Sequence, residues 1–180
     1  MEINAVSTIN HPLDRVYLAY RDELPRIATY VNNIKGIKVL AREELSGKVK
    51  LHNEWTGRGE IPKVAQGLVK PEMLSWDDYA EWSDAEHIVR WNLKIRVFSD
   101  KFRCTGTNRL SAEGPNRTRV HLVGQLDLDL REIPGVPRFL ASSIAPQVEK
   151  FIVALVKPNL EEVNVAIGRY LDSGGKLAQA

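Results

Sequence analysis

The sequence contains a single cysteine, Cys104, and only four histidines, which are His11, His52, His87 and His121. One thiol cannot form an intramolecular disulfide or a thiolate metal cluster. The histidines have neither the His-x-His nor the HExxH spacing of a metal site. We therefore expect no metal and no cofactor, and a buried structural role for Cys104. A reducing, cytoplasmic setting fits this cysteine content.

Long apolar runs and an excess of one charge are also missing. The longest apolar run covers residues 151–156, which is far too short to span a bilayer. The N-terminus lacks the basic and apolar regions of a secretory signal. The 25 lysines and arginines nearly balance the 23 acidic residues. The charge balance predicts no nucleic-acid partner, and the short apolar run predicts no stable membrane insertion.

The length and the composition are those of one ordinary domain. The 180 residues are 43% hydrophobic and 27% charged, and a chain of this length buries about 70% of the surface of its unfolded form. We predict one domain over residues 1–172. The polar, small residues of the SGGKLAQA end predict a flexible tail over residues 173–180.

The spacing of apolar residues predicts the order of the elements. Alternation from Ile3 to Ile9 indicates a first strand, and helical spacing after Leu13, broken at Pro25, indicates two short helices. From Ile37 the period becomes two, which favours about six antiparallel strands. Apolar residues between 139 and 170 return to helical spacing. We expect this last helix to begin at Pro146, to kink or break at Pro158 and to cover the apolar face of the sheet.

This order, together with its local residues, resembles the START-like (SRPBCC, Bet v 1-like) superfamily. STINHPLDRVYLAYRDELPRIATYVNNIKGIKVL is similar to its first strand, helix pair and second strand. SWDDYAEWSDAEHIVRWNLKI and the Gly-Thr strand TGTNRL resemble polyketide cyclase-type members. The resemblance implies an α+β helix-grip fold, in which a curved antiparallel sheet wraps around a long C-terminal helix and leaves a cavity. Members bind lipids, sterols, quinones, polyketides or plant hormones, and a minority catalyse cyclisation, hydration or hydrolysis.

The hairpin over residues 75–95 concentrates three tryptophans and five carboxylates. Strand alternation places Asp77, Tyr79 and Glu81 on one face and Trp76, Asp78 and Trp82 on the other. We expect Asp77 and Glu81 to face solvent, where the cations of the next strand, Arg90, Lys94 and Arg96, can pair with them. Asp78 shares the inward face with tryptophans, so it is the candidate acid/base.

Three functions remain open. The first is binding of a hydrophobic small molecule or lipid in the cavity, without covalent chemistry. The residues predicted to line the cavity are Asn53, Trp55, Trp76, Asp78, Trp82, Trp91, Leu93, Asn108, Leu122, Phe151 and Leu155. Pure core packing explains the four tryptophans equally well.

The second function is a cyclase, dehydratase or hydrolase for a polyketide-like substrate, with Asp78 as general acid/base and Tyr79 or Asn53 assisting. The third is a partner-binding module or homodimer that uses a sheet edge or the Leu68-Val69 region.

Overall fold

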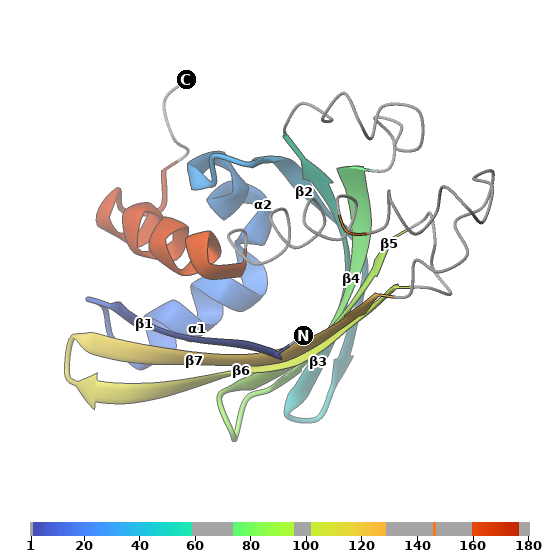
Figure 1. Ribbon diagram of the computed structural model, residues 1–180. Coiled ribbons are helices and arrows are strands. Elements are labelled where there is room, and N and C mark those ends of the chain that lie inside the picture. The colour runs from blue at the N-terminus through green and yellow to red at the C-terminus, as the bar shows by residue number, and fades with distance from the viewer. Residues whose placement is uncertain (1, 59–73, 96–101, 129–145, 147–159, 177–180) are drawn as a thin grey trace, which may run out of the picture.

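A computed structural model describes residues 2–58, 74–95, 102–128, 146 and 160–176 of the chain (Figure 1). The described strands form one antiparallel sheet in the order β1-β7-β6-β5-β4-β3-β2. Their bounds are β1 Glu2–Ile9, β2 Ile34–Leu45, β3 Lys48–Gly57, β4 Ser75–Ser83, β5 Ile88–Ile95, β6 Phe102–Gly114 and β7 Arg117–Leu128. The predicted first strand and the six strands after the helices are confirmed.

The short helices follow β1, as predicted. α1 spans Leu13–Asp22, α2 spans Leu24–Ile27 and a 3-10 turn, η1, spans Ala28–Tyr30. Pro25 lies in the first turn of α2. Backbone N–H groups in a first turn make no hydrogen bond within the helix, so proline, which lacks this group, is tolerated there. Figure 1 shows the sheet curving around these helices, which lie on its concave side. The aromatic face of α1 packs on the sheet there.

The C-terminal helix also packs on the sheet. Residues 160–172 are helical. Asn164 donates a hydrogen bond to Ser7 of β1 (3.2 Å), and Val163, Ala166 and Ile167 are buried in the core. Pro146 has helical backbone, whereas the predicted kink at Pro158 and the predicted lining residues Phe151 and Leu155 lie outside the described residues. No helix in the described part of the chain is long and apolar enough to cross a membrane.

The end of this helix is closed by glycines. Gly174 and Gly175 both have positive φ, and their N–H groups bond to the carbonyls of Leu171 and Tyr170. The Tyr30 hydroxyl donates to the Lys176 carbonyl (2.9 Å). These contacts tie residues 173–176 to the domain; residues 177–180 are outside the described part.

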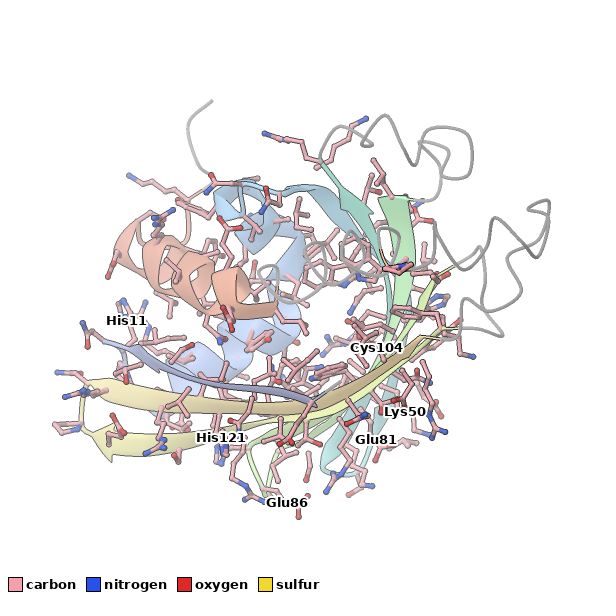
Figure 2. All side chains as sticks on the ribbon, viewed as in Figure 1. His11, Lys50, Glu81, Glu86, Cys104 and His121 are labelled. Atoms are coloured by element: carbon pink, nitrogen blue, oxygen red, sulfur yellow. The ribbon has the colours of Figure 1, made fainter. Side chains whose placement is uncertain are left out.

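The two faces of the sheet separate the side chains as strand alternation predicted. Lys50, Glu81 and His121 lie on the convex side in Figure 2, whereas Cys104 lies on the concave side and is fully buried. Burial raises the pKa of the Cys104 thiol to about 12, so this cysteine is a structural residue.

The outward carboxylates of β4 pair with side chains of β3. Glu81 forms an ion pair with Lys48 (2.9 Å), and Asp77 bonds to His52 (2.8 Å). The predicted partners on β5, Arg90 and Lys94, lie directly opposite Glu81 and Asp77 in register. Arg96 lies outside the described residues.

Candidate ligand-binding site

The concave face of the sheet gathers the predicted polar residues. Asn53 of β3, Asp78 of β4 and Leu93 of β5 are direct neighbours in register and are all buried. Because side chains alternate, three residues of different strands at the same register point into the same layer. The resulting row places one amide and one carboxylate among apolar side chains.

Asp78 is the central charge of this row. Its Oδ2 accepts hydrogen bonds from Asn53 Nδ2 (3.2 Å) and from Trp55 Nε1 (3.3 Å). Burial, opposed by these two hydrogen bonds and by His52, raises the pKa of the Asp78 carboxyl to about 6. The carboxylate therefore titrates close to neutral pH, as the inward placement predicted.

Two oxygens of the row have no hydrogen-bond partner among the residues that the structure describes. They are Asp78 Oδ1 and Asn53 Oδ1, and both are inaccessible to solvent. Buried polar atoms in folded proteins are nearly always satisfied, since an unsatisfied one costs about 1–3 kcal/mol. Trp82 Nε1 and Asn164 Oδ1 are the other such atoms in the described part of the chain. Asp78 and Asn53 differ from them because their two side chains also bond to each other.

Two tryptophans lie beside the free acceptors. Trp55 and Trp76 are opposite each other in register, and their rings are nearly parallel, with centroids 5.9 Å apart. Trp55 is 8% exposed, and Trp76 is half-buried at the margin of the core. An aromatic pair of this kind provides a flat apolar surface next to the carboxylate.

Trp91 occupies a slot made by two glycines. Gly106 of β6 and Gly124 of β7 are opposite each other in register, and a Cβ atom added to either would collide with the Trp91 ring, at 2.8 Å in the case of Gly124. Trp91 Nε1 donates to Asn108 Oδ1 (3.0 Å), and Asn108 Nδ2 donates to the Tyr20 hydroxyl (2.7 Å). The indole is thus held flat on the sheet and is linked to α1.

Trp82 and Leu122 lie under the helices. Trp82 is 1% exposed, and its ring makes edge contacts with Tyr17 and Tyr20 of α1, at 5.4 and 5.3 Å between centroids. Leu122 is fully buried and is paired in register with Asn108. The contacts of Trp82 join the sheet to α1, whereas Trp55 and Trp76 lie on the Asp78 side of the concave face.

Tyr79 cannot assist Asp78, and that part of the enzyme hypothesis is wrong. It is 40% exposed on the convex face, where its ring stacks on His52 (4.3 Å). Alternation along β4 points adjacent residues to opposite faces, so Tyr79 and Asp78 are on different sides of the sheet. Asn53, the other predicted assistant, does contact Asp78.

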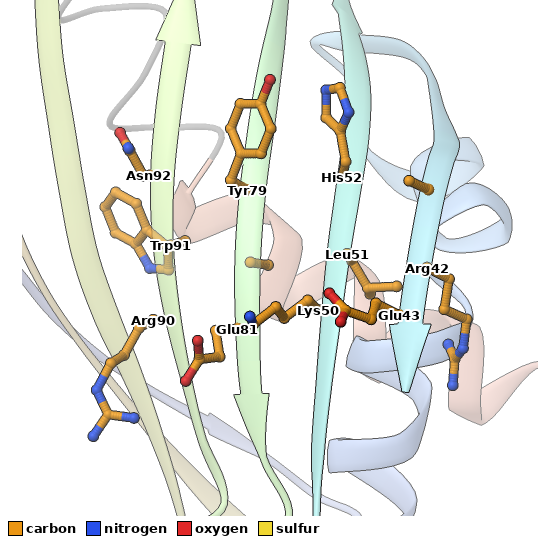
Figure 3. A pocket seen from close by; sticks show the side chains of 12 residues that line it. Arg42, Glu43, Lys50, Leu51, His52, Tyr79, Glu81, Arg90, Trp91 and Asn92 are labelled. Carbon is orange, nitrogen blue, oxygen red and sulfur yellow. The ribbon is translucent and has the colours of Figure 1, made fainter. Parts of the chain in front are cut away.

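A shallow groove of about 470 Å³ lies on the convex face (Figure 3). It includes His52 and Tyr79 and a transverse row of alternating charges, Glu43, Lys50, Glu81 and Arg90, from β2 to β5. The groove faces away from Asn53 and Asp78, so it is separate from the buried polar row. Its mixed, exposed charges offer no apolar enclosure for a hydrophobic ligand.

The part of the chain that the structure describes contains no cluster of three His, Cys, Asp or Glu side chains that could hold a metal ion. Sequence reasoning missed three residues of the site, Tyr20, Gly106 and Gly124. Glycines within two adjacent strands are a signal of close approach by another group. No local signal connects Tyr20 with Asn108, because 88 positions separate them in the chain.

No family profile and no curated protein matches this sequence, but solved structures do. The chain is similar to the protein TTHA0849 from Thermus thermophilus (22% identity, TM-score 0.67, 98% of this chain and 100% of that chain). It is also similar to the ZhuI aromatase/cyclase from Streptomyces sp. R1128 (15% identity, TM-score 0.61, 98% of this chain and 99% of that chain).

A third similar structure is norcoclaurine synthase from Thalictrum flavum in complex with dopamine and hydroxybenzaldehyde (11% identity, TM-score 0.62, 99% of this chain and 89% of that chain). These likenesses extend over nearly the whole chain. The chain therefore has the α+β helix-grip fold, and by this fold it resembles the START-like, Bet v 1-like superfamily.

Proposed function

We propose that the protein binds a hydrophobic small molecule or lipid against the concave face of its sheet, without covalent chemistry. The observation that supports this function best is the buried row of Asn53 and Asp78 beside the Trp55–Trp76 pair. Apolar walls supply most of the binding free energy of such a ligand, and a few polar groups orient it. The fold is one in which other proteins bind hydrophobic ligands or act as cyclases.

Mild purification followed by solvent extraction and mass spectrometry tests the proposal directly. We expect an apolar compound to co-purify, or the protein to bind the neutral fluorescent probe N-phenyl-1-naphthylamine in an apolar environment. Absence of both a co-purified compound and probe binding would refute ligand binding.

A matched pair of variants locates the ligand on one face. Trp76 and Tyr79 are both aromatic residues of β4, but they lie on opposite faces of the sheet. Trp76→Ala should weaken probe binding roughly tenfold, since it removes a stacking surface. Tyr79→Ala should leave the affinity unchanged. If instead Tyr79→Ala weakens probe binding and Trp76→Ala does not, the ligand binds in the convex groove.

The second candidate function is catalysis with Asp78 as general acid/base. It is favoured by one observation, the pKa of about 6, which suits proton transfer at neutral pH. The cyclase and synthase names of two similar structures agree with it. Turnover that follows a titration near pH 6, and that Asp78→Asn abolishes while the probe still binds, would establish this function over simple binding.

A further inference from the structure

Asp78 and Asn53 present a paired set of acceptors to the interior. Asn53 Nδ2 and Trp55 Nε1 both donate to the same atom, Asp78 Oδ2. This leaves Asp78 Oδ1 and Asn53 Oδ1 without a partner. Each free oxygen belongs to a group that takes part in the 3.2 Å bond between the two side chains. The two free oxygens therefore belong to two side chains that contact each other directly.

No residue in the described part of the chain donates a hydrogen bond to these two oxygens. Leu93 is on the far side of Asp78 in the row, and Trp55 has already used its only donor. Among the described residues, two titratable groups interact electrostatically with Asp78. One is His52, which bonds to Asp77 on the opposite face of the sheet. The other is Tyr20 of α1, whose hydroxyl accepts a hydrogen bond from Asn108. No lysine or arginine of the described part pairs with Asp78.

We infer that the ligand is an aromatic compound with a hydrogen-bond donor, a hydroxyl or an amine, that donates to Asp78 Oδ1 while its ring lies beside Trp55 and Trp76. An amine with a second N–H can also use Asn53 Oδ1. This inference rests on the proposed function and specifies its ligand. A purely apolar lipid would leave both oxygens unsatisfied. Such an unpaired buried acceptor is what makes a polar site reject an analogue that lacks the donor.

The test compares two probes that differ only in the donor. 2-Naphthol has a hydroxyl, and 2-methoxynaphthalene has the same ring without a donor. We expect the wild-type protein at pH 7.5 to bind 2-naphthol at least tenfold more tightly than the ether in calorimetric or fluorescence titrations. 2-Naphthylmethylamine, tested in parallel, shows whether a cationic donor is preferred over a neutral one.

The variant Asp78→Asn keeps the volume of the side chain but replaces a free acceptor with an amide group. It should abolish the preference for 2-naphthol and change the affinity for the ether less than twofold. Glu81→Gln, on the opposite face of the same strand, should retain the full preference, because Glu81 pairs with Lys48 outside the core. Thermal unfolding and circular dichroism show that both variants are folded.

The outcomes separate the two proposals. If the ether binds as tightly as both donor compounds, the donor inference is wrong, but the apolar site remains. If none of the probes binds, ligand binding and the donor inference are both refuted. A donor preference that survives in Asp78→Asn would also overturn the inference, since the recognition would then lie elsewhere.

Discussion

Asp78 is a carboxylate buried in a largely apolar layer, and its burial has a consequence for stability. Its pKa of about 6 in the folded protein lies above the usual value near 3.8, so the folded state holds the proton more tightly than the unfolded state. The free energy of unfolding should therefore fall as the pH rises from about 4 through about 6, by roughly 3 kcal/mol in total, and stay level above that range.

Asp78→Asn should remove this dependence. The amide oxygen still accepts from Asn53 and Trp55, and no charge is buried. We expect the variant to be roughly 3 kcal/mol more stable than the wild type at pH 7, with little difference at pH 4. Urea unfolding of both proteins at pH 4 and pH 7 measures this difference in the free energy of unfolding. A variant that is less stable at pH 7, or that retains the slope, would contradict the account.

Glu81→Gln serves as the control for this experiment. Lys48 lowers the pKa of the exposed Glu81 carboxyl. The contribution of Glu81 to the free energy of unfolding is therefore present above its unfolded pKa and is lost as the pH falls. This pH dependence is opposite in sign to that of Asp78. We expect a small effect, because exposed ion pairs contribute little.

Gly106 and Gly124 should tolerate no side chain while Trp91 lies over them. Gly106→Ala or Gly124→Ala forces the indole out of its slot, and we expect a loss of about 1–3 kcal/mol in the free energy of unfolding. The tryptophan fluorescence should change as well.

Two further variants make this prediction specific to Trp91. Gly114→Ala is the matched control, because nothing lies within 4 Å of a Cβ added there. Combining Gly124→Ala with Trp91→Phe should recover part of the lost stability, because only the Trp91 ring lies closer than 3.0 Å to a Cβ added at Gly124. Strictly additive losses in the double variant would mean that the glycine acts through something other than Trp91.

At the scale of elements, α1 is attached to the sheet by one carboxylate in the β4–β5 turn. Asp84 Oδ1 accepts from the Tyr17 hydroxyl (2.9 Å) and from Arg21 Nη1 (2.8 Å). Together with the contacts of Tyr17 and Tyr20 on Trp82, these bonds position α1 over the concave face. Asn108 then meets Tyr20 inside.

Asp84→Ala should destabilise the protein by about 1–3 kcal/mol, because the Tyr17 hydroxyl loses its acceptor and the side chain of Arg21 keeps only Asp22. Chemical denaturation measures the change. Glu86→Ala in the same turn should have an effect below about 0.5 kcal/mol, since the ion pair of Glu86 is with the exposed Arg90 at 3.5 Å. Equal effects of the two substitutions would show that Asp84 does not position α1.

At the scale of the whole molecule, the described sheet has two edges, β1 and β2. β2 pairs only with β3, and its register shifts between Val39 and Ala41. Charged side chains and irregular register are features that protect a sheet edge from pairing with another chain. The interior strands β5 and β6 are instead paired on both sides.

Hydrogen exchange followed by NMR should report this difference. We expect the outward amides of β2 to exchange at least a hundredfold faster than the amides of β5 and β6, because only the latter are hydrogen-bonded within the sheet. Uniform protection along β2 that depends on protein concentration would instead indicate that a second copy pairs with this edge, as in the homodimer hypothesis.

Much of the candidate site follows from local patterns. Period-two alternation alone placed Asp78 and the hairpin tryptophans inside and Asp77 and Glu81 outside, because a strand has only two faces. Buried asparagines in apolar strands, such as Asn53 and Asn108, were recognisable on the same grounds. The order of strands and helices was likewise predictable, since prolines, turn residues and periodicity are local signals.

The partners of these residues depend on the tertiary structure. Strand alternation shows that Asp78 faces inward, but it does not show that Asn53 and Trp55 both bond to one of its oxygens and leave the other free. Register between strands brings Trp91 over Gly106 and Gly124, and the docking of α1 brings Tyr20 to Asn108. Alternation is a property of one strand, whereas these contacts join strands and a helix that are distant in sequence. The sequence by itself therefore determined which face each residue occupies, and the folded structure decided which polar atoms of the described residues have a hydrogen-bond partner.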